Sequence, residues 1–199
     1  MVAKELYQQA LSAFRDLLDE ATRAGEPEPT AMTLATADAN GRVSARIVLL
    51  KAADEDGFTF YTNYESAKAH ELSARNNAAL CILWKTLRDK VQVRVEGVIE
   101  KAGADESDAY FASRARESQI GAWASLQSQT LNDRAELDAR IAEYERKFAG
   151  VPVPRPPYWG GYRLVPDMIE LWFGQRHRLH ERVRYELAAG TWSKRMLYP

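Results

Sequence analysis

The first apolar pattern along the chain has the spacing of an amphipathic helix. Its members are Leu6, Ala10, Phe14, Leu17, Leu18 and Ala21. Residues three and four apart share one helix face, and Gly25 followed by Pro27 ends the pattern. We therefore predict a helix over residues 3–24, with a linker to residue 28, whose apolar face packs on a larger body.

After residue 29 the pattern changes to that of β-strands. Residues 32–36 and 43–51 flank the turn Asp38-Ala39-Asn40-Gly41 and predict a β-hairpin. Further strands are predicted over residues 58–62, 79–84, 91–100, 158–164, 168–173, 179–187 and 192–197. Within 91–100, valines alternate with polar residues, so one face should be core and the other polar.

Helical and irregular segments separate these strands. The patterns predict helices over residues 66–76, 105–125 and 133–148, and the four prolines in 151–157 predict a stiff connector. The strands after this connector are too few for an independent barrel. We therefore expect a single domain over residues 1–199 that is predominantly β with α, an antiparallel barrel surrounded by helices.

Composition limits the classes of function. The 199 residues are 46% hydrophobic and 28% charged, enough to bury a core, and the net charge of -1 creates no global field for nucleic acid or an anionic membrane. The single cysteine, Cys81, lies in an apolar run, which predicts a core thiol and suits a reducing compartment. With no secretory signal and no membrane-length apolar stretch, we expect a cytoplasmic protein without nucleic-acid or membrane partners.

The segment Arg178-Leu-His-Glu-Arg182 carries the most distinctive chemistry. In an extended strand, Arg178, His180 and Arg182 would share one face. Two fixed cations beside a titratable imidazole favour an anionic, proton-handling ligand, although a solvated strand face explains the segment alone equally well. His177 and His180 have a zinc-like spacing, but no third ligand is evident and we expect no metal site.

Two other groups of residues could bind an anion. On a continuous helix, Tyr110, Arg114 and Ser118 would line one face with donors suited to a phosphate, although an exposed helix face is the simpler interpretation. Arg46 and Lys51 bracket four aliphatic residues in a predicted strand. Strict alternation sends them to opposite faces, so a bend or a shared interface is needed to bring both into one pocket.

Several longer motifs occur along the chain. They are RIVLLK at 46–51, FYTNYES at 60–66, QVRVEG at 92–97, YFASRARESQIGAWAS at 110–125, QS at 127–128, YWGGYR at 158–163 and WFGQRHRLHER at 172–182. Together, in this order, they resemble the pyridoxine/pyridoxamine 5'-phosphate oxidases, FMN enzymes that make pyridoxal 5'-phosphate. The likeness extends from about Pro29 to Pro199.

This resemblance implies an FMN-binding split β-barrel that forms a homodimer, with FMN in clefts at the subunit interface. One subunit would hold the flavin through Arg46, Ile47, Val48, Leu49, Leu50, Lys51, Tyr61, Thr62 and Lys68, and the other through Gln92, Gln127, Ser128, Trp172 and Arg182. Lys51, Tyr110, Arg114 and Ser118 would bind the substrate phosphate. Arg178 and His180 would face the substrate ring as the catalytic residues.

The implied reaction converts pyridoxamine or pyridoxine 5'-phosphate to pyridoxal 5'-phosphate by hydride transfer to FMN, while oxygen is reduced to hydrogen peroxide. Two alternatives are a related split-barrel flavin oxidase acting on another substrate, such as a phenazine precursor, and a module that binds FMN or pyridoxal phosphate without turnover.

The chain departs from the family pattern at two places. The family usually reads Ser-Arg-Lys where this chain has Ser66-Ala67-Lys68, which predicts weaker FMN retention. The Arg-x-x-Tyr segment that helps cover the substrate in the family has no counterpart ahead of the first predicted helix. Its loss predicts incomplete closure over the substrate.

Overall fold

The computed structural model describes residues 2–199, with side chains from Glu5 onward, so residue 1 of the expected domain lies outside the described residues. Its helices are α1 (Val2–Arg23), α2 (Ala67–Ala74), α3 (Ala104–Ser113), α4 (Arg116–Ala124) and α5 (Arg134–Lys147). Its strands are β1 (Ala31–Ala37), β2 (Val43–Leu49), β3 (Ala52–Asp54), β4 (Gly57–Asn63), β5 (Asn77–Trp84), β6 (Val91–Lys101), β7 (Trp159–Phe173), β8 (Glu181–Ala188) and β9 (Thr191–Leu197).

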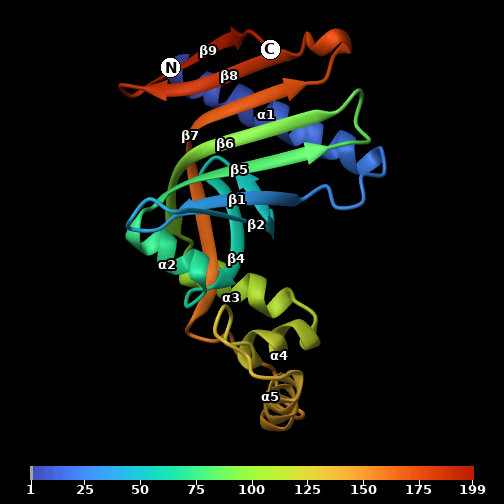
Figure 1. The fold of residues 1–199 in the computed structure, drawn as a ribbon, viewed down its shortest axis with the longest axis vertical. Helices are drawn as coiled ribbons and strands as arrows, with labels where there is room; N and C mark the ends of the chain where they lie inside the picture. Colours follow the sequence, from blue (N-terminus) through green and yellow to red (C-terminus); the bar gives the residue numbers. More distant parts are fainter. Residues whose placement is uncertain (1) are drawn as a thin grey trace.

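The strands form one antiparallel sheet in the order β2-β1-β5-β6-β7-β4-β3, with β8 and β9 added beyond β7. The first part of β7, Trp159–Leu164, pairs with β4, whereas Met168–Phe173 pairs with β8. Figure 1 shows the result: β8 and β9 lie at one end of the long axis, and α3, α4 and α5 lie at the other.

Strand β7 is continuous, so the prediction of two separate strands over 158–164 and 168–173 was wrong. Pro166 lies within β7, where the β6–β7 register shifts between Glu96 and Gly97. Such an irregularity tolerates a residue without a backbone donor. Gly97 permits the close approach, because a Cβ there would lie 2.1 Å from the carbonyl oxygen of Val165.

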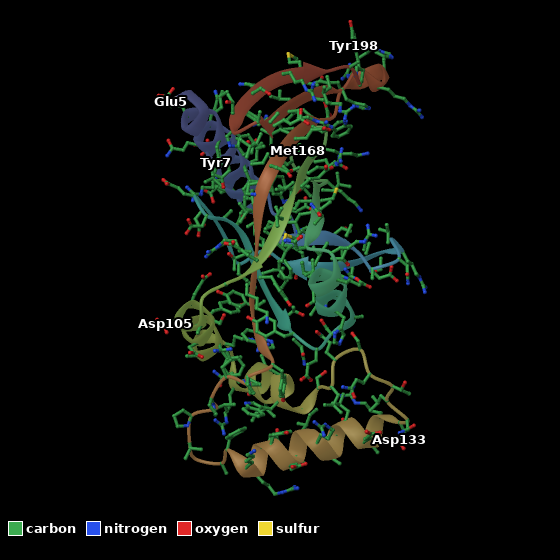
Figure 2. The ribbon with its side chains drawn as sticks, turned by 90° about the vertical axis from the view of Figure 1, so that its left-hand side faces the viewer. Glu5, Tyr7, Asp105, Asp133, Met168 and Tyr198 are labelled. Atoms are coloured by element: carbon green, nitrogen blue, oxygen red, sulfur yellow. The ribbon has the colours of Figure 1, made fainter. Side chains whose placement is uncertain are left out.

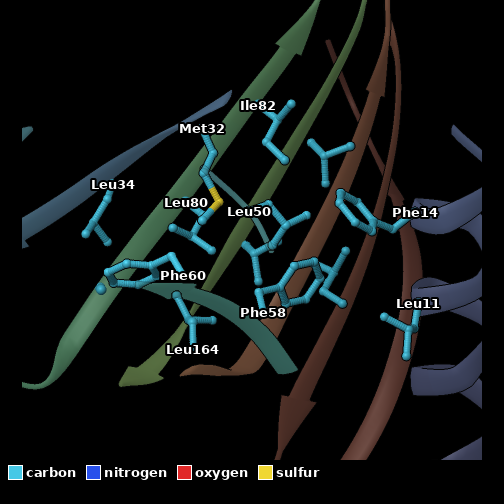
Figure 3. Packing of buried hydrophobic residues seen from close by; sticks show 14 of the residues in the cluster. Leu11, Phe14, Met32, Leu34, Leu50, Phe58, Phe60, Leu80, Ile82 and Leu164 are labelled. Atoms are coloured by element: carbon cyan, nitrogen blue, oxygen red, sulfur yellow. The ribbon is translucent and has the colours of Figure 1, made fainter. Parts of the chain in front are cut away.

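The core lies between the curved sheet and α1. Leu11 and Phe14 of the predicted helical stripe are buried, and Figure 3 shows both among the core side chains. The Phe14 ring packs edge-on against Phe58, with ring centroids 5.0 Å apart. On β6, Val91, Val93 and Val95 are buried and the residues between them are half-buried, which confirms the predicted two-faced strand. The helix over 3–24 is likewise confirmed.

The continuous helix predicted over 105–125 is instead two helices. Helix α3 ends at Ser113, and Arg114 has extended backbone angles (φ −74°, ψ 151°) before α4 begins. The buried Gln119 side chain donates to the carbonyl oxygens of Phe111 (2.9 Å) and Ala112 (3.3 Å). Gln119 thus adds a partner for carbonyls at the end of α3, where Phe111 also accepts from the backbone N–H of Arg114 at 3.2 Å.

The prediction of Cys81 as a core thiol was wrong. On β5, Leu80 and Ile82 point into the core, whereas Cys81 is half-buried on the opposite face and pairs in register with Arg94. Burial raises the pKa of its thiol. Among residues 2–199, no helix is both long and apolar enough to cross a membrane.

Candidate functional site

A cavity of about 890 Å³, here called the phosphate cavity, opens between β2, β4, α3 and α4. Among the residues proposed from the sequence, it is lined by Arg46, Ile47, Val48, Leu49, Lys51, Tyr61, Thr62, Lys68, Tyr110, Arg114, Ser118 and Gln127. Sequence reasoning missed Asn63, Ala115, Gly121, Ala122, Ser125 and Trp159. The lining combines fixed cations with apolar and aromatic surface, which suits a flat ligand carrying an anionic group.

Arg46 and Lys51 reach this cavity from the same chain because the strand between them ends early. Strand β2 stops at Leu49, after which the backbone N–H of Leu50 bonds to Thr30 and that of Lys51 bonds to Thr59. The side chain of Leu50 turns into the core, where it is 3% exposed, and does not line the cavity. A bend therefore brings both cations together without a second subunit.

Arg46 is held at the cavity by Glu71 of α2. Its Nη2 donates to Glu71 Oε2 at 2.8 Å and to Ser44 Oγ at 2.5 Å, and its Nη1 donates to Thr36 Oγ1. Burial alone would raise the pKa of Glu71, but hydrogen bonds from Thr36, Ser44 and Arg46 outweigh it and lower that pKa. The carboxylate therefore stays charged and fixes the guanidinium.

Lys68 lies beside Arg46 with weaker partners. Its Nζ donates to Thr62 Oγ1, Ser66 Oγ and Gln127 Oε1, each at 3.2 Å, and all of these acceptors are neutral. Burial and the nearby Arg46 lower the pKa of Lys68. Gln127, which the resemblance assigned to the second subunit, thus contacts the cavity of its own chain.

The opposite wall of the cavity is an aromatic stack. The rings of Tyr61 and Tyr110 lie 3.9 Å apart and nearly parallel, and Trp159 stacks on Tyr61 at 5.5 Å. Gly161, paired with Tyr61 across the sheet, leaves room for the stack because a Cβ there would lie 3.0 Å from Tyr61 Cε1. Burial and the neighbouring Glu106 raise the pKa of Tyr61 to about 12, so its phenol stays protonated at neutral pH.

Arg114 lies against this stack. Its guanidinium is 4.6 Å from the Trp159 ring, and its buried Nη1 has no hydrogen-bond partner among the residues that the structure describes. Burial lowers the pKa of this arginine. Tyr110 comes from α3, Arg114 from the break and Ser118 from α4, so the three converge on one cavity although no continuous helix joins them.

A second group of predicted residues lies across β6, β7 and β8. Gln92 pairs in register with Trp172, and Trp172 pairs with Arg182, so the three form a cross-strand row. We call these three residues the flavin row. None of them lines the phosphate cavity within the described chain.

The predicted strand through Arg178, His180 and Arg182 was wrong. A 3-10 turn occupies Arg176–Arg178, with positive φ at His177 (56°) and Arg178 (62°), and β8 begins only at Glu181. The turn is closed because the backbone N–H of Leu179 bonds to Arg176 and that of Gln175 bonds to His180 Nδ1 at 3.1 Å. Such backbone angles are uncommon outside glycine and often mark functional turns.

His180 nevertheless lies next to the flavin row, and Arg178 precedes it by two residues. The His180 ring is 4.4 Å from the Trp172 ring and borders a second cavity of about 900 Å³, which Arg176 and Tyr198 also line. Arg178 is exposed and has no hydrogen bond or ion pair among residues 2–199. Because Nδ1 of His180 accepts a hydrogen bond, the neutral ring carries its proton on Nε2.

Ser128, the remaining predicted flavin residue, lies outside the phosphate cavity. It has a positive φ of 74° and borders a surface groove with Ala67 and His70. In the part of the chain that the structure describes, no cluster of three or more histidine, cysteine or acidic side chains could hold a metal ion.

Comparison with known families identifies the architecture. Residues 18–148 match the family model described as pyridoxamine 5'-phosphate oxidase. The chain belongs to this family. Residues 159–199 match the model of the pyridoxine 5'-phosphate oxidase C-terminal dimerisation region, which includes β7, β8 and β9.

Relatives in the pyridoxamine 5'-phosphate oxidase family are similar over nearly their whole length. A protein of Xanthomonas euvesicatoria pv. vesicatoria named pyridoxine/pyridoxamine 5'-phosphate oxidase is 58% identical over 197 residues, which cover 98% of this chain and 99% of that protein. A protein of the same name from Myxococcus xanthus is 54% identical and covers 95% of this chain and 91% of its own. These names support an oxidoreductase.

Solved structures confirm the predicted fold class, a split β-barrel with surrounding helices. PhzG from Burkholderia lata 383, in complex with tetrahydrophenazine-1-carboxylic acid, superposes with a TM-score of 0.89 at 34% identity over 94% of this chain and 91% of its own. A pyridoxamine 5'-phosphate oxidase-related, FMN binding protein from Nostoc punctiforme has a TM-score of 0.74 at 18% identity, which covers 94% and 96% of the two chains and supports the fold alone.

Proposed function

We propose that this family member is an FMN-dependent oxidase that converts pyridoxamine 5'-phosphate and pyridoxine 5'-phosphate to pyridoxal 5'-phosphate. The observation that carries the proposal is Arg114, a half-buried cation whose buried Nη1 has no partner among the described residues, beside the hydroxyls of Tyr110 and Ser118. An arginine with added neutral donors suits a phosphate dianion. The names of the relatives support the same substrates.

The cavity fits two anionic ligands better than one. It contains four cations, Arg46, Lys51, Lys68 and Arg114. Glu71 already pairs with Arg46, and the remaining three positive charges exceed the charge of one phosphate dianion. Arg46 and Lys68 would hold the FMN phosphate, and Lys51 and Arg114 would hold that of the substrate. Between them lie the aliphatic side chains of 47–49, which suit the flat apolar surface of a flavin ring.

When bound, FMN supplies the hydride acceptor and passes two electrons on to oxygen. Overall, pyridoxamine 5'-phosphate, water and oxygen give pyridoxal 5'-phosphate, ammonia and hydrogen peroxide, whereas the alcohol substrate needs no water and releases no ammonia. The chain's own residues bind and orient the reactants, which accounts for much of the catalysis in such enzymes.

Within this proposal, His180 and Arg178 face the substrate ring. The Nε2–H of His180 can donate to the phenolic oxygen of the substrate, because Gln175 occupies Nδ1 and Trp172 packs against the ring. Arg178 is held in its turn by a strained backbone and keeps its donors available to the substrate.

We further propose that two copies of the chain form the complete site as a homodimer, since the flavin row lies outside the phosphate cavity. Support comes from the match of residues 159–199 to a dimerisation region. In addition, β2 presents Val43 and Ile47 to solvent at 70% and 64% exposure, and Ile47 also lines the cavity. A cytoplasmic location completes the proposal and rests on Cys81, a free thiol that suits a reducing compartment.

A second candidate is oxidation of a reduced phenazine, favoured by the likeness to PhzG with its bound tetrahydrophenazine-1-carboxylic acid. That ligand carries a carboxylate but no phosphate. The cluster of Lys51, Tyr110, Arg114 and Ser118 therefore argues for the phosphorylated substrates.

The deciding experiment measures peroxide release by the FMN-loaded protein with pyridoxamine 5'-phosphate, pyridoxine 5'-phosphate, a reduced phenazine carboxylate or no substrate. We expect release with the two phosphorylated compounds only. Release with the phenazine alone would replace the proposal by the second candidate. A protein that binds FMN but releases no peroxide with any substrate would be a binding module.

A further inference from the structure

Glu170 on β7 is a buried carboxylate outside the phosphate cavity. It is 2% exposed, and each of its oxygens accepts two hydrogen bonds from one arginine. Oε1 accepts from Nε (3.0 Å) and Nη2 (2.8 Å) of Arg182, and Oε2 accepts from Nε (3.1 Å) and Nη2 (2.7 Å) of Arg184. The Nη1 of Arg94 lies 3.8 Å from Oε2.

These contacts keep Glu170 ionised in spite of its burial. Burial alone would raise its pKa, but the hydrogen bonds and charges of Arg184 and Arg182 outweigh it and lower that pKa. A buried ion pair of this kind often adds little net stability compared with apolar residues of the same size. Stability alone is therefore a weak explanation for the cluster.

The contact between Glu170 and Arg182 is diagonal across the sheet. In the β7–β8 register, Glu170 lies opposite Arg184, whereas Arg182 lies opposite Trp172. The Arg182 side chain therefore extends past its cross-strand partner Trp172 to reach Oε1 of Glu170, two residues away on β7. Its Nη1 donates to the carbonyl oxygen of Tyr198 at 3.1 Å. All three nitrogens of this guanidinium thus donate hydrogen bonds. These bonds fix the plane of the guanidinium within the flavin row.

We propose that Glu170 is a positioning residue for flavin binding, which acts by holding the Arg182 guanidinium in the orientation that the flavin meets. The inference rests on the proposed function, in which Arg182 and Trp172 contact FMN. A long arginine side chain loses rotamer freedom when it binds a ligand, and a partner that orders it beforehand lowers that cost. Glu170 would therefore contribute to FMN affinity without touching FMN.

Arg184 provides a matched control within the same cluster. It makes the same two-bond contact with Glu170 as Arg182 does, but with the other oxygen, and it has no proposed flavin contact. If Glu170 only joins β7 to β8, loss of Arg184 should matter as much as loss of Arg182. If Glu170 positions Arg182, only changes that reach Arg182 should weaken FMN binding.

The test is a double-mutant cycle on the FMN dissociation constant, measured by quenching of flavin fluorescence. We expect Glu170→Gln and Arg182→Met each to raise it about tenfold, the equivalent of one lost charged hydrogen bond. The double variant should be no weaker than Arg182→Met alone, and Arg184→Met should stay within about twofold of the wild type. At saturating FMN, Glu170→Gln and Arg182→Met should change the visible circular dichroism of the flavin in the same way.

Additive losses in the double variant, wild-type affinity in Glu170→Gln or in Arg182→Met, or an equal loss in Arg184→Met would overturn the inference and leave the proposed function intact. A wild-type protein that binds no FMN would overturn the proposed function itself, and the inference with it. If far-ultraviolet circular dichroism shows that Glu170→Gln does not fold, Glu170→Asp replaces it in the cycle, because it keeps the charge but is too short for the same contacts.

Discussion

Arg114 of the phosphate cavity and Arg182 of the flavin row differ in the partners of their guanidinium groups. In the cavity, Arg114 keeps a buried donor without a partner and Lys68 bonds only neutral acceptors. In the flavin row, Arg182 donates to the buried carboxylate of Glu170, and Arg184, which lies outside the row, donates to the same carboxylate. The contrast indicates that Arg114 keeps a donor available for an anionic ligand, whereas Arg182 already has a carboxylate partner that orients its guanidinium.

The largest effect is expected from removal of the guanidinium of Arg114, whose buried Nη1 has no hydrogen-bond partner among the described residues. We expect Arg114→Met to raise the KM for pyridoxamine 5'-phosphate by about 30-fold or more, because a charged hydrogen bond to phosphate contributes about 2 kcal/mol or more. The Tm of the apoprotein should not fall, since the buried, unpaired Nη1 of the half-buried Arg114 is itself unfavourable. Steady-state kinetics and thermal unfolding measure the two effects.

Arg116→Met is the matched control for Arg114. Arg116 lies two residues further along, and its guanidinium donates to the carbonyl oxygens of Val151 and Phe148 instead of lining the cavity. We expect a lower Tm and an unchanged KM. The same KM increase in both variants would mean that Arg114 acts through the local fold, and the contrast between the regions would fail.

A smaller effect should follow the protonation of Lys68, whose folded pKa lies below the ordinary 10.5. Between the two values the unfolded chain binds more protons than the folded one, so apoprotein stability should rise with pH. Over the same window FMN affinity should fall, because the lysine loses the charge that attracts the phosphate.

Lys68→Met should remove both trends and raise the FMN dissociation constant about fivefold at neutral pH, from the loss of about 1 kcal/mol of charge attraction. Titration of FMN at several pH values and thermal unfolding of the apoprotein provide the measurements. The exposed Lys85, outside the cavity, serves as the control in Lys85→Met. FMN affinity in Lys68→Met that still falls with pH as in the wild type would show that another group titrates.

The smallest expected effect adds a charge next to Lys68. Ala67 is exposed at the start of α2 and borders the surface groove near Ser128, at the position where the resemblance predicts arginine. We expect Ala67→Arg to lower the FMN dissociation constant about threefold, as an exposed ion pair would. An unchanged constant, equal to that of Ala74→Arg at the far end of the same helix, would contradict the predicted weak flavin retention.

The sequence predicted the elements whose signal is local. The stripe from Leu6 to Ala21 and the alternation in β6 depend on one periodic pattern each, and both are confirmed. The helix break and the turn were missed because a contact between a side chain and the backbone decides each of them, which periodicity does not reveal. Gln119 ends α3 by bonding carbonyls seven and eight residues earlier, and the turn at Arg176–Arg178 is closed by the side chain of His180.

The same division applies to the candidate site: residues in local motifs were predicted, whereas residues whose role depends on contacts between elements were missed. The motifs identified the cations that line the phosphate cavity. The helical spacing of Tyr110, Arg114 and Ser118 was the wrong reason for their proximity, because Arg114 lies in a break between two helices. Trp159 was missed, since its role depends on stacking with Tyr61 across the sheet. Glu170 was missed too, because a glutamate in an apolar strand gives no sign of two arginines on the next strand.

Because β7 is a single continuous strand, the number of residues in it determines which face each of its side chains occupies. This single strand begins beside the phosphate cavity at Trp159 and reaches the flavin row at Trp172. Side chains alternate between the two faces of a strand, so the gain or loss of one residue would reverse every side chain beyond it unless a bulge absorbed the change. Glu170 and Trp172 would then exchange faces with Ile169 and Leu171. Substitutions along β7 are therefore expected to be tolerated far more readily than insertions or deletions.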